Sequence, residues 1–319
     1  MNNRIKKLRE KSLHAINKLS VERALLITEF YKSDVAYEVS TPVRRALSFK
    51  YIMQNKTLYI GNNELIIGER GSEPKATPTY PEISLHSLKD LEILDARPKV
   101  SFKVDENSKQ IYKEVIIPYW KGKNNRDKIM KTMSPEWLDA YNAGVFTEFQ
   151  EQRAPGHTVA GNKIYEKGMK DIKKDIEDSI SKLDYFNDPK AYDKHEELKA
   201  MHIVADTIIM YANRNADKLE QLAQNEHNND RKKELEEIIK VCRNVPENAP
   251  QNFHEAIQYY WFVHLGVITE LNPWDSFNPG RLDQHLHPFY IKGIEDGRLT
   301  KEQAIELLQA FWIKFNNHP

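Results

Sequence analysis

The sequence predicts a helix-rich α/β protein, and three features of its 319 residues support that class. The first 54 residues read as helices. Nearly every segment after residue 160 spaces its apolar side chains three and four positions apart, which places them on one face of a helix. Between these two parts, short runs of β-branched and aromatic residues flank turn-forming sequences, a pattern typical of β-hairpins.

The first helices have recognisable starts. Ser20 is expected to cap one helix, because a serine oxygen accepts hydrogen bonds from the free backbone N–H groups of a first turn. Thr41 is expected to cap the next helix, with Pro42 at the first helical position, where the missing N–H of proline costs nothing. Residues 3–54 are therefore predicted to be helical.

The predicted strands lie between residues 57 and 120. The run TLYIGNNELIIGER at 57–70 surrounds a Gly-Asn-Asn turn and predicts a short hairpin or loop–strand unit. A second hairpin is predicted for 99–120, where two alternating runs flank the turn sequence Asp-Glu-Asn-Ser-Lys. Between them, residues 72–98 contain four prolines and little periodicity, which indicates an ordered surface or lining loop.

Amphipathic helices dominate the remainder of the chain. Their apolar stripes are Ile172, Ile176, Ile180 and Leu183; Leu198, Met201, Ala205, Ile208, Ile209 and Ala212; and Leu235, Ile238, Ile239 and Cys242. The segment 253–272 is apolar on nearly all sides, which predicts a central, buried helix. The last helix, within 299–317, should begin with a capping box formed by Thr300 and Gln303.

Composition disfavours several classes of function. Lys+Arg and Asp+Glu both number 47 and no basic block stands alone, so nucleic-acid binding is not expected. A single cysteine, Cys242, allows no intramolecular disulfide and suits a reducing compartment. The start does not read as a signal peptide, and the longest apolar stretch, 259–268, is far shorter than the roughly 20 residues of a membrane span. We expect a soluble, cytoplasmic protein, and its length allows one large domain or two smaller ones.

Two polar sequences could carry chemistry. In EFQEQRAPGHTVAGNK, His157 follows a Pro-Gly turn near Phe149, so its imidazole could act as a general acid or hydrogen-bond donor, or could merely satisfy backbone groups of a loop. In WDSFNPGRLDQHLHPFY, Asp275, Arg281 and Asp283 surround a second Pro-Gly turn. Arg281 and Asp283 could form a structural ion pair, or the group could contribute to a site, chiefly through Asp275.

Metal binding and thiol catalysis are not predicted. The sequence DQHLHP offers Asp283, His285 and His287, but only the first and last share a helix face, and no HExxH motif or cysteine pair supports a metal site. Cys242 lies on the apolar stripe of its helix, which indicates a small core residue rather than a reactive thiolate.

Six segments of the sequence together point to one family. They are LSVERALLITEFY, TPVRRALSFKYIM, NNELIIGERG, RAPGHTV, VCRNVPENAPQNFHEAIQYYWFVHLGVITELN and WDSFNPGRLDQHLHPFY. They resemble the amino-terminal portion of glycyl radical enzymes of the pyruvate formate-lyase superfamily, and within it the hydroxyproline dehydratases. The likeness extends over essentially the whole chain, and the last three segments are the most specific.

This resemblance implies a fold and a reaction. The fold would be the amino-terminal portion of a ten-stranded β/α barrel, built from two antiparallel five-stranded halves and wrapped by helices. In such enzymes a glycyl radical near the C-terminus, installed by a radical-SAM activating enzyme, oxidises a cysteine whose thiyl takes a hydrogen atom from the substrate. Hydroxyproline dehydratases convert trans-4-hydroxy-L-proline into 1-pyrroline-5-carboxylate and water. No other bound cofactor is implied, and full-length members are expected to be homodimers.

The resemblance also assigns roles to three residues. His157 would contact the C4 hydroxyl of the substrate, Asp275 would contact the polar groups of its ring, and Phe149 would pack against the ring. Because hydroxide is a poor leaving group, a donor beside the hydroxyl lowers the barrier, and a carboxylate beside the amine orients the ring. Arg281 is expected to be a structural residue of the same turn as Asp275.

The sequence departs from the family in two motifs. Neither the Gly-Cys-Val-Glu loop with the thiyl cysteine nor the Arg-Val-x-Gly-Tyr motif with the radical glycine occurs, and Cys242 stands in an unrelated helical context. We therefore expect residues 1–319 to be the amino-terminal part of a pyruvate formate-lyase-type domain, less than half of the enzyme and inactive alone. The chain could be a truncated gene product, an incomplete gene model, or one half of a split enzyme that binds a complementing C-terminal chain. Two alternatives remain: another family member, of the formate acetyltransferase, glycerol or diol dehydratase or choline lyase type, and a non-catalytic helical scaffold.

Overall fold

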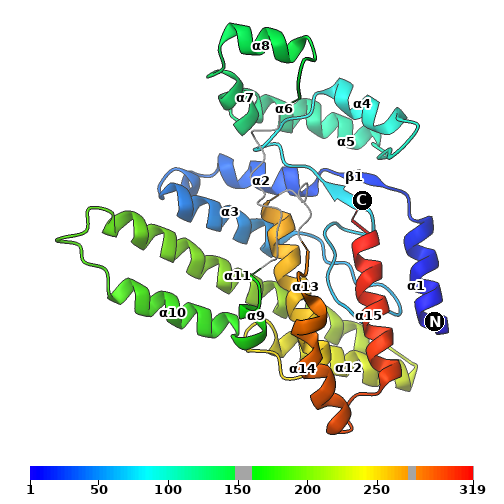
Figure 1. Ribbon diagram of the computed structural model, residues 1–319. Coiled ribbons are helices and arrows are strands. Elements are labelled where there is room, and N and C mark those ends of the chain that lie inside the picture. Colours follow the sequence, from blue (N-terminus) through cyan, green and yellow to red (C-terminus); the bar gives the residue numbers. More distant parts are fainter. Residues whose placement is uncertain (148–159, 272–277, 319) are drawn as a thin grey trace.

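The computed structural model describes residues 1–147, 160–271 and 278–318, and helices dominate them (Figure 1). The α-helices in chain order are α1 Asn3–His14, α2 Glu22–Lys32, α3 Thr41–Asn55, α4 Leu88–Ala96, α5 Glu106–Ile111, α6 Ile117–Trp120, α7 Asn125–Met130, α8 Pro135–Asn142, α9 Lys163–Glu166, α10 Met169–Ser181, α11 Ala191–Gln224, α12 Asn229–Asn244, α13 Phe253–Glu270, α14 Leu282–Glu295 and α15 Lys301–Asn316. A 3-10 turn, η1 Asp34–Ala36, and a π-helical turn, η2 Tyr112–Ile116, complete the helical elements. No helix among the described residues is long and apolar enough to cross a membrane.

Two short strands pair within the described part of the chain. Strand β1, Lys18–Ser20, lies parallel to β2, Ala76–Pro78, with Lys18 opposite Ala76 and Ser20 opposite Pro78. Parallel pairing needs a long connection, and here α2, α3 and the following extended segment supply it. The pair lies between α1 and the group formed by α4 to α8 (Figure 1).

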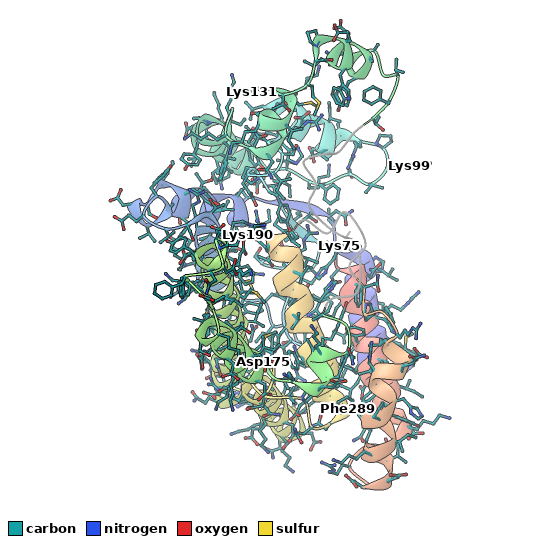
Figure 2. The ribbon with its side chains drawn as sticks, turned by 60° about the vertical axis from the view of Figure 1, so that its left-hand side comes forward. Lys75, Lys99, Lys131, Asp175, Lys190 and Phe289 are labelled. Atoms are coloured by element: carbon teal, nitrogen blue, oxygen red, sulfur yellow. The ribbon has the colours of Figure 1, made fainter. Side chains whose placement is uncertain are left out.

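Two apolar cores organise the helices. The larger core surrounds α13, whose side chains are buried on all sides, as the apolar sequence of 253–272 predicts. The smaller core joins α2 to the end group of α4 to α8 through Ile27, Leu91, Tyr112 and Ile116. In the rotated view, Lys131 lies in that end group and Phe289 lies in the larger helical part (Figure 2).

The prediction of a hairpin or loop–strand unit at 57–70 is wrong, because this described segment contains turns and bends but no strand. Side chains of α13, rather than a neighbouring strand, form hydrogen bonds with the backbone of this segment. The Gln258 amide bonds both backbone groups of Ile67, accepting from its N–H at 2.7 Å and donating to its C=O at 2.9 Å. The Trp261 indole N–H donates to the Gly68 carbonyl at 3.0 Å. The apolar run therefore lies along a helix, with its polar backbone groups satisfied.

The second predicted hairpin, at 99–120, is also wrong, because the segment is helical from Glu106 onward. Asp105 caps this helix by accepting a hydrogen bond from the Ser108 N–H at 2.7 Å. Tyr112, Ile116 and Trp120 are all buried, and their spacing of four is helical rather than alternating. The proline-rich stretch 72–98 is not wholly a loop either, since it contains β2 and α4.

Two of the three predicted helix caps differ from the structure, and the third is confirmed. Ser20 does not cap α2: it is the last residue of β1, and Val21 occupies the N-cap position without a side-chain bond. The start of α3 is one residue earlier than predicted, with Ser40 as N-cap and Thr41 inside the helix. The capping box of α15 is confirmed, since Thr300 Oγ1 accepts from the Gln303 N–H at 3.1 Å and Gln303 accepts from the Thr300 N–H at 2.8 Å.

Removing this cap should destabilise the fold measurably. The variant Thr300→Ala loses the acceptor for the Gln303 N–H, so we expect the free energy of unfolding to fall by about 1 kcal/mol in urea denaturation. Thr300→Ser keeps the hydroxyl and is expected to stay near the parent value. Equal losses in the two variants would contradict a role for the hydroxyl.

Candidate functional site

Phe149, His157 and Asp275, the three residues predicted to form the site, lie outside the described residues. The described residues next to them show how the two segments 148–159 and 272–277 are anchored. The first segment leads into α9, and the second connects the end of α13 to α14. These anchoring residues are the part of the predicted site region that the structure describes.

The residues that follow the two segments are in contact with each other. The Tyr165 ring of α9 stacks on the His285 ring of α14, with centroids 4.9 Å apart and an interplanar angle of 16°. Phe289, one helical turn beyond His285, lies 6.3 Å from the same tyrosine ring. Helix α9 also packs on α13. Residues of α9 and α14 that are more than 110 positions apart in sequence are therefore neighbours in the fold.

The residues before the second segment are fixed by a buried arginine. Arg23 is 4% exposed and donates from Nε to the Thr269 carbonyl at 2.6 Å and from Nη1 to the Thr79 carbonyl at 3.2 Å. Its Nη2 donates to Glu82 Oε1 at 2.6 Å. Burial alone would lower the pKa of Arg23, but Glu82 outweighs that effect and raises it. The guanidinium therefore stays charged and ties the last turn of α13 to α2 and the 79–82 loop.

Tyr80 and Arg45 add to this anchoring. The Tyr80 hydroxyl donates to the Ile268 carbonyl, and the Arg23 guanidinium lies 4.0 Å from the centre of the Tyr80 ring. Arg45 of α3 donates from Nε to Glu270 Oε1 at 3.0 Å. Burial raises the pKa of Glu270, an effect that Arg45 opposes. Sequence reasoning missed these groups, because a lone arginine in a first helical turn carries no signal of burial.

A large apolar groove lies beside the end of α13. Its volume is about 630 Å³, and it is formed by α3, α10, α11 and α13. Its apolar lining residues include Phe49, Met169, Ile172, Met201, Val204, Val263, Val267 and Leu271. Leu271 is the residue immediately before 272–277, so the groove adjoins the anchor of the predicted site.

The predicted ion pair between Arg281 and Asp283 is not formed, although the structure describes both residues. Both side chains are exposed, at the start of α14. Asp283 instead lines an apolar groove of about 460 Å³ together with His287, as their shared helix face predicts. Across the described residues, no group of three or more His, Cys, Asp or Glu side chains could hold a metal ion.

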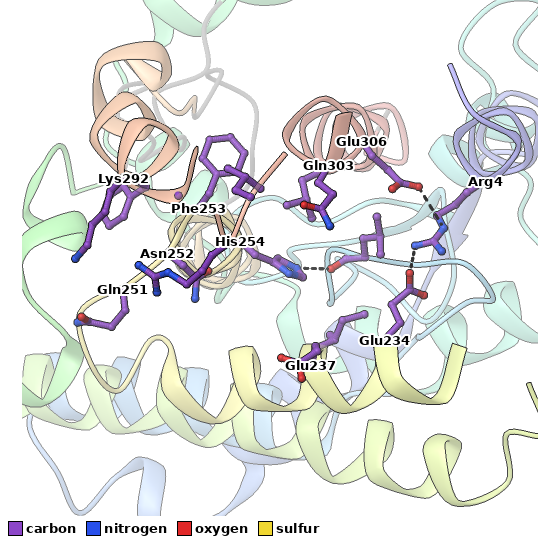
Figure 3. Close-up of a pocket in the computed structure, with 17 residues that line it drawn as sticks. Arg4, Glu234, Glu237, Gln251, Asn252, Phe253, His254, Lys292, Gln303 and Glu306 are labelled. Atoms are coloured by element: carbon purple, nitrogen blue, oxygen red, sulfur yellow. Dashed lines mark hydrogen bonds and ion pairs between the residues drawn. The ribbon is translucent and has the colours of Figure 1, made fainter. Parts of the chain in front are cut away.

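A polar hollow of about 360 Å³ lies at the opposite end of α13 (Figure 3). Arg4 lines the hollow and forms ion pairs with Glu234 and with Glu306, the latter at 3.4 Å. The His254 ring nitrogen Nε2 lies 2.8 Å from the Leu65 carbonyl, and burial lowers the pKa of this imidazole. With 18 residues, α13 is about 27 Å long. The hollow is therefore separate from the anchors at the other end of α13, and Arg4 already pairs with two of its carboxylates.

A buried charge cluster connects the 64–69 segment to α15. Lys314, 2% exposed, donates to Glu69 Oε1 at 2.7 Å and to Glu64 Oε2 at 3.1 Å. His318 Nε2 lies 3.2 Å from Glu69 Oε2. Burial alone would raise the pKa of Glu69, but Lys314 and His318 lower it to about 2. Glu69 is therefore ionised, and the cluster is a structural support close to Trp261, whose ring stacks on His318.

Comparisons with known proteins give consistent matches. The family model described as pyruvate formate lyase-like matches residues 1–319. The trans-4-hydroxy-L-proline dehydratase of Clostridioides difficile is 52% identical over 318 residues, which are 99% of this chain and 40% of that protein.

Solved structures match over the whole chain. The crystal structure of hydroxyproline dehydratase from Clostridioides difficile with trans-4-hydroxy-L-proline bound has a TM-score of 0.96 at 51% identity, covering 100% of this chain and 40% of that one. The glycerol-bound form of the B12-independent glycerol dehydratase from Clostridium butyricum has a TM-score of 0.91 at 31% identity, covering 99% and 40%. The chain thus spans about 40% of the length of these relatives.

Proposed function

The chain belongs to the pyruvate formate lyase-like family, and from that premise we propose that its residues form part of a dehydratase acting on trans-4-hydroxy-L-proline. One observation carries the proposal: the TM-score of 0.96 at 51% identity with a dehydratase structure that holds this substrate. The predicted family and the helix-rich fold class, as the amino-terminal portion of the family barrel, are confirmed. The substrate and the reaction are what we propose.

In this proposal, three side chains of the chain line the substrate. His157 donates a proton to the C4 hydroxyl as it leaves, which turns a poor leaving group into water. Asp275 accepts hydrogen bonds from the ring ammonium and orients the carbon from which hydrogen is removed. Phe149 packs on the ring. The contact between Tyr165 and His285 supports this arrangement, because it brings the residues that follow both segments to one place.

The chain's own thiol does not fit the radical chemistry of the family. The resemblance requires an accessible cysteine, oxidised by a glycyl radical, whose thiyl removes hydrogen from the substrate. Cys242 is the only cysteine in the sequence, it is 1% exposed on α12, and burial raises the pKa of its thiol. Its predicted role as a core residue is confirmed, and no reaction step is assigned to it. The radical, its radical-SAM activating enzyme and the thiyl are proposed to act through the part of the relatives beyond the matched 40%.

We propose that the main partner is a polypeptide that supplies the rest of the family fold. The relatives carry about 60% of their length outside the match, and that part must pack on some face of these helices. The apolar groove beside Leu271 is the face we assign to it, because Met201 and Val204 are 53% and 37% exposed there. A homodimer of the completed fold is part of the same proposal.

The experiment is reconstitution under anaerobic conditions. The chain is co-expressed with a separate polypeptide that carries the remaining part of a hydroxyproline dehydratase, and the complex is treated with a radical-SAM activating enzyme. We expect a glycyl radical signal in electron paramagnetic resonance and loss of trans-4-hydroxy-L-proline. Copurification of the two chains, absent in a Met201→Lys variant, tests the groove separately.

The alternatives give different results in the same assay. The match to the glycerol dehydratase makes glycerol or a diol the second candidate substrate. The assay therefore tests glycerol as well as hydroxyproline as a substrate. Turnover of glycerol alone would assign the chain to that type. A folded, associated complex that gives neither a radical signal nor turnover would contradict the enzyme proposal and favour the scaffold.

A further inference from the structure

Two buried polar atoms near the end of α13 have no hydrogen-bond partner among the residues that the structure describes. They are Nε of Arg70 and Oγ1 of Thr269, on side chains that are 6% and 4% exposed. Arg70 donates from Nη2 to the Tyr80 hydroxyl at 3.3 Å, and no carboxylate within the described residues pairs with it. An unsatisfied donor and an unsatisfied hydroxyl at this depth are uncommon in a folded protein and require an explanation.

Both residues line the same small cavity. Its volume is about 10 Å³, and its other lining residues are Ser20, Glu22, Arg23, Ile52, Lys56, Gly71 and Pro78. A cavity needs roughly 10–15 Å³ to accommodate one water molecule, and that water needs two to four polar partners. Volume and lining therefore meet the requirements of a single water.

We propose that this cavity is a binding site for one permanent water molecule. The water accepts a hydrogen bond from Arg70 Nε–H and donates one to Thr269 Oγ1, so both unsatisfied atoms gain a partner. The second hydrogen of the water can be donated to an oxygen of Ser20 or Glu22, which line the same cavity. The water thus completes a bridge between the 64–71 segment and the last turn of α13.

The size of the cavity favours water over an anion. Its volume of about 10 Å³ holds one water molecule but excludes ions of the size of chloride. Two of the neighbouring cations also have partners already: Arg23 pairs with Glu82, and Lys56 donates to the carbonyl oxygens of Glu69 and Arg70, each at 2.8 Å. A neutral molecule with both a donor and an acceptor satisfies the two atoms.

The test is a crystal structure of the 319-residue chain, alone or in its reconstituted complex, at a resolution that shows ordered water. We expect one water within about 2.7–3.2 Å of both Arg70 Nε and Thr269 Oγ1. Thr269→Val should lose this water and lower the melting temperature by about 2–4 °C, whereas Thr269→Ser should keep the water. Crystals grown in bromide should show no anomalous signal in the cavity.

A matched control separates the water from the general effect of replacing a buried threonine. Thr207 of α11 is fully buried, but its hydroxyl already donates to the Ile203 carbonyl at 2.7 Å. Thr207→Val should therefore change the melting temperature by less than Thr269→Val does. An empty cavity in the parent protein, or a bromide peak in it, would overturn the proposal irrespective of how the variants fold.

Discussion

Replacing His157 with glutamine is expected to lower kcat/KM for trans-4-hydroxy-L-proline by about 10²–10⁴-fold in the reconstituted enzyme. Glutamine has a similar reach and can still donate a hydrogen bond, but it cannot deliver a proton to the departing C4 hydroxyl. The loss should therefore fall on kcat more than on KM, since the ground state keeps most of its contacts. Steady-state assays of hydroxyproline consumption measure both constants.

His287 provides the matched control for this variant. It is an exposed histidine on α14, in the groove between α14 and α15, and the proposal gives it no contact with substrate. His287→Gln should keep kcat/KM within about twofold of the parent enzyme. Equal activities of the His157 and His287 variants would remove His157 from the proposed site, while a loss confined to KM would reduce it to a binding residue.

The anchors limit where the proposed site can lie. Tyr165 and His285 are in contact six and eight positions after the two predicted segments, and Arg23 bonds the Thr269 carbonyl three positions before the second. Each of these contacts joins residues that are far apart in sequence. The proposed site is therefore bounded by helices that are fixed to one another, which is the arrangement that precise positioning needs.

Helical periodicity predicted most of the fold because the helices bury continuous stripes. The stripe of Ile172 and Ile176 lies on α10, the all-round apolar character of 253–272 marks α13, and Cys242 is buried on α12 as predicted. The apolar run at 64–67 led to a wrong strand prediction for a physical reason. Its backbone bonds side chains of α13, and local propensity cannot distinguish a side-chain partner from a neighbouring strand.

Polar contacts between distant segments could not be predicted from one sequence. Lys314 and Glu69 are 245 positions apart, and each looks like an ordinary surface charge in its own segment. The same holds for Arg23 with Glu82 and Arg45 with Glu270. For the site, His157 and Asp275 came from the resemblance to a family, because residue spacing alone left their roles open. They remain predictions.

Replacing Lys314 with methionine is expected to lower the free energy of unfolding by about 3–5 kcal/mol. Lys314 is the cation between Glu64 and Glu69, which are 6% and 2% exposed. Without it, two carboxylates remain buried side by side, with His318 and the Asn317 amide as polar partners of Glu69 but no lysine to neutralise them, and such charges are costly to keep out of water. Lys301→Met, on the exposed first turn of the same helix, should change stability by less than about 0.5 kcal/mol.

The pH dependence distinguishes loss of charge from loss of packing in this variant. In the parent protein the pKa of Glu69 is lowered from 4.5 to about 2, so its ionised form stabilises the fold above pH 4.5 and that contribution is lost as the pH falls towards 2. Burial raises the pKa of Glu64. Protonation of Glu64 therefore stabilises the fold as the pH falls, which is opposite in sign to the effect of Glu69. Removing Lys314 should raise both pKa values, so acid should relieve part of the damage. Urea titrations at several pH values should therefore show the gap between variant and parent narrowing as the pH falls, first above pH 4.5 as the variant's carboxyls take up protons and further below it as the parent loses the contribution of Glu69. A constant gap would indicate lost packing, and no gap at neutral pH would contradict the buried cluster.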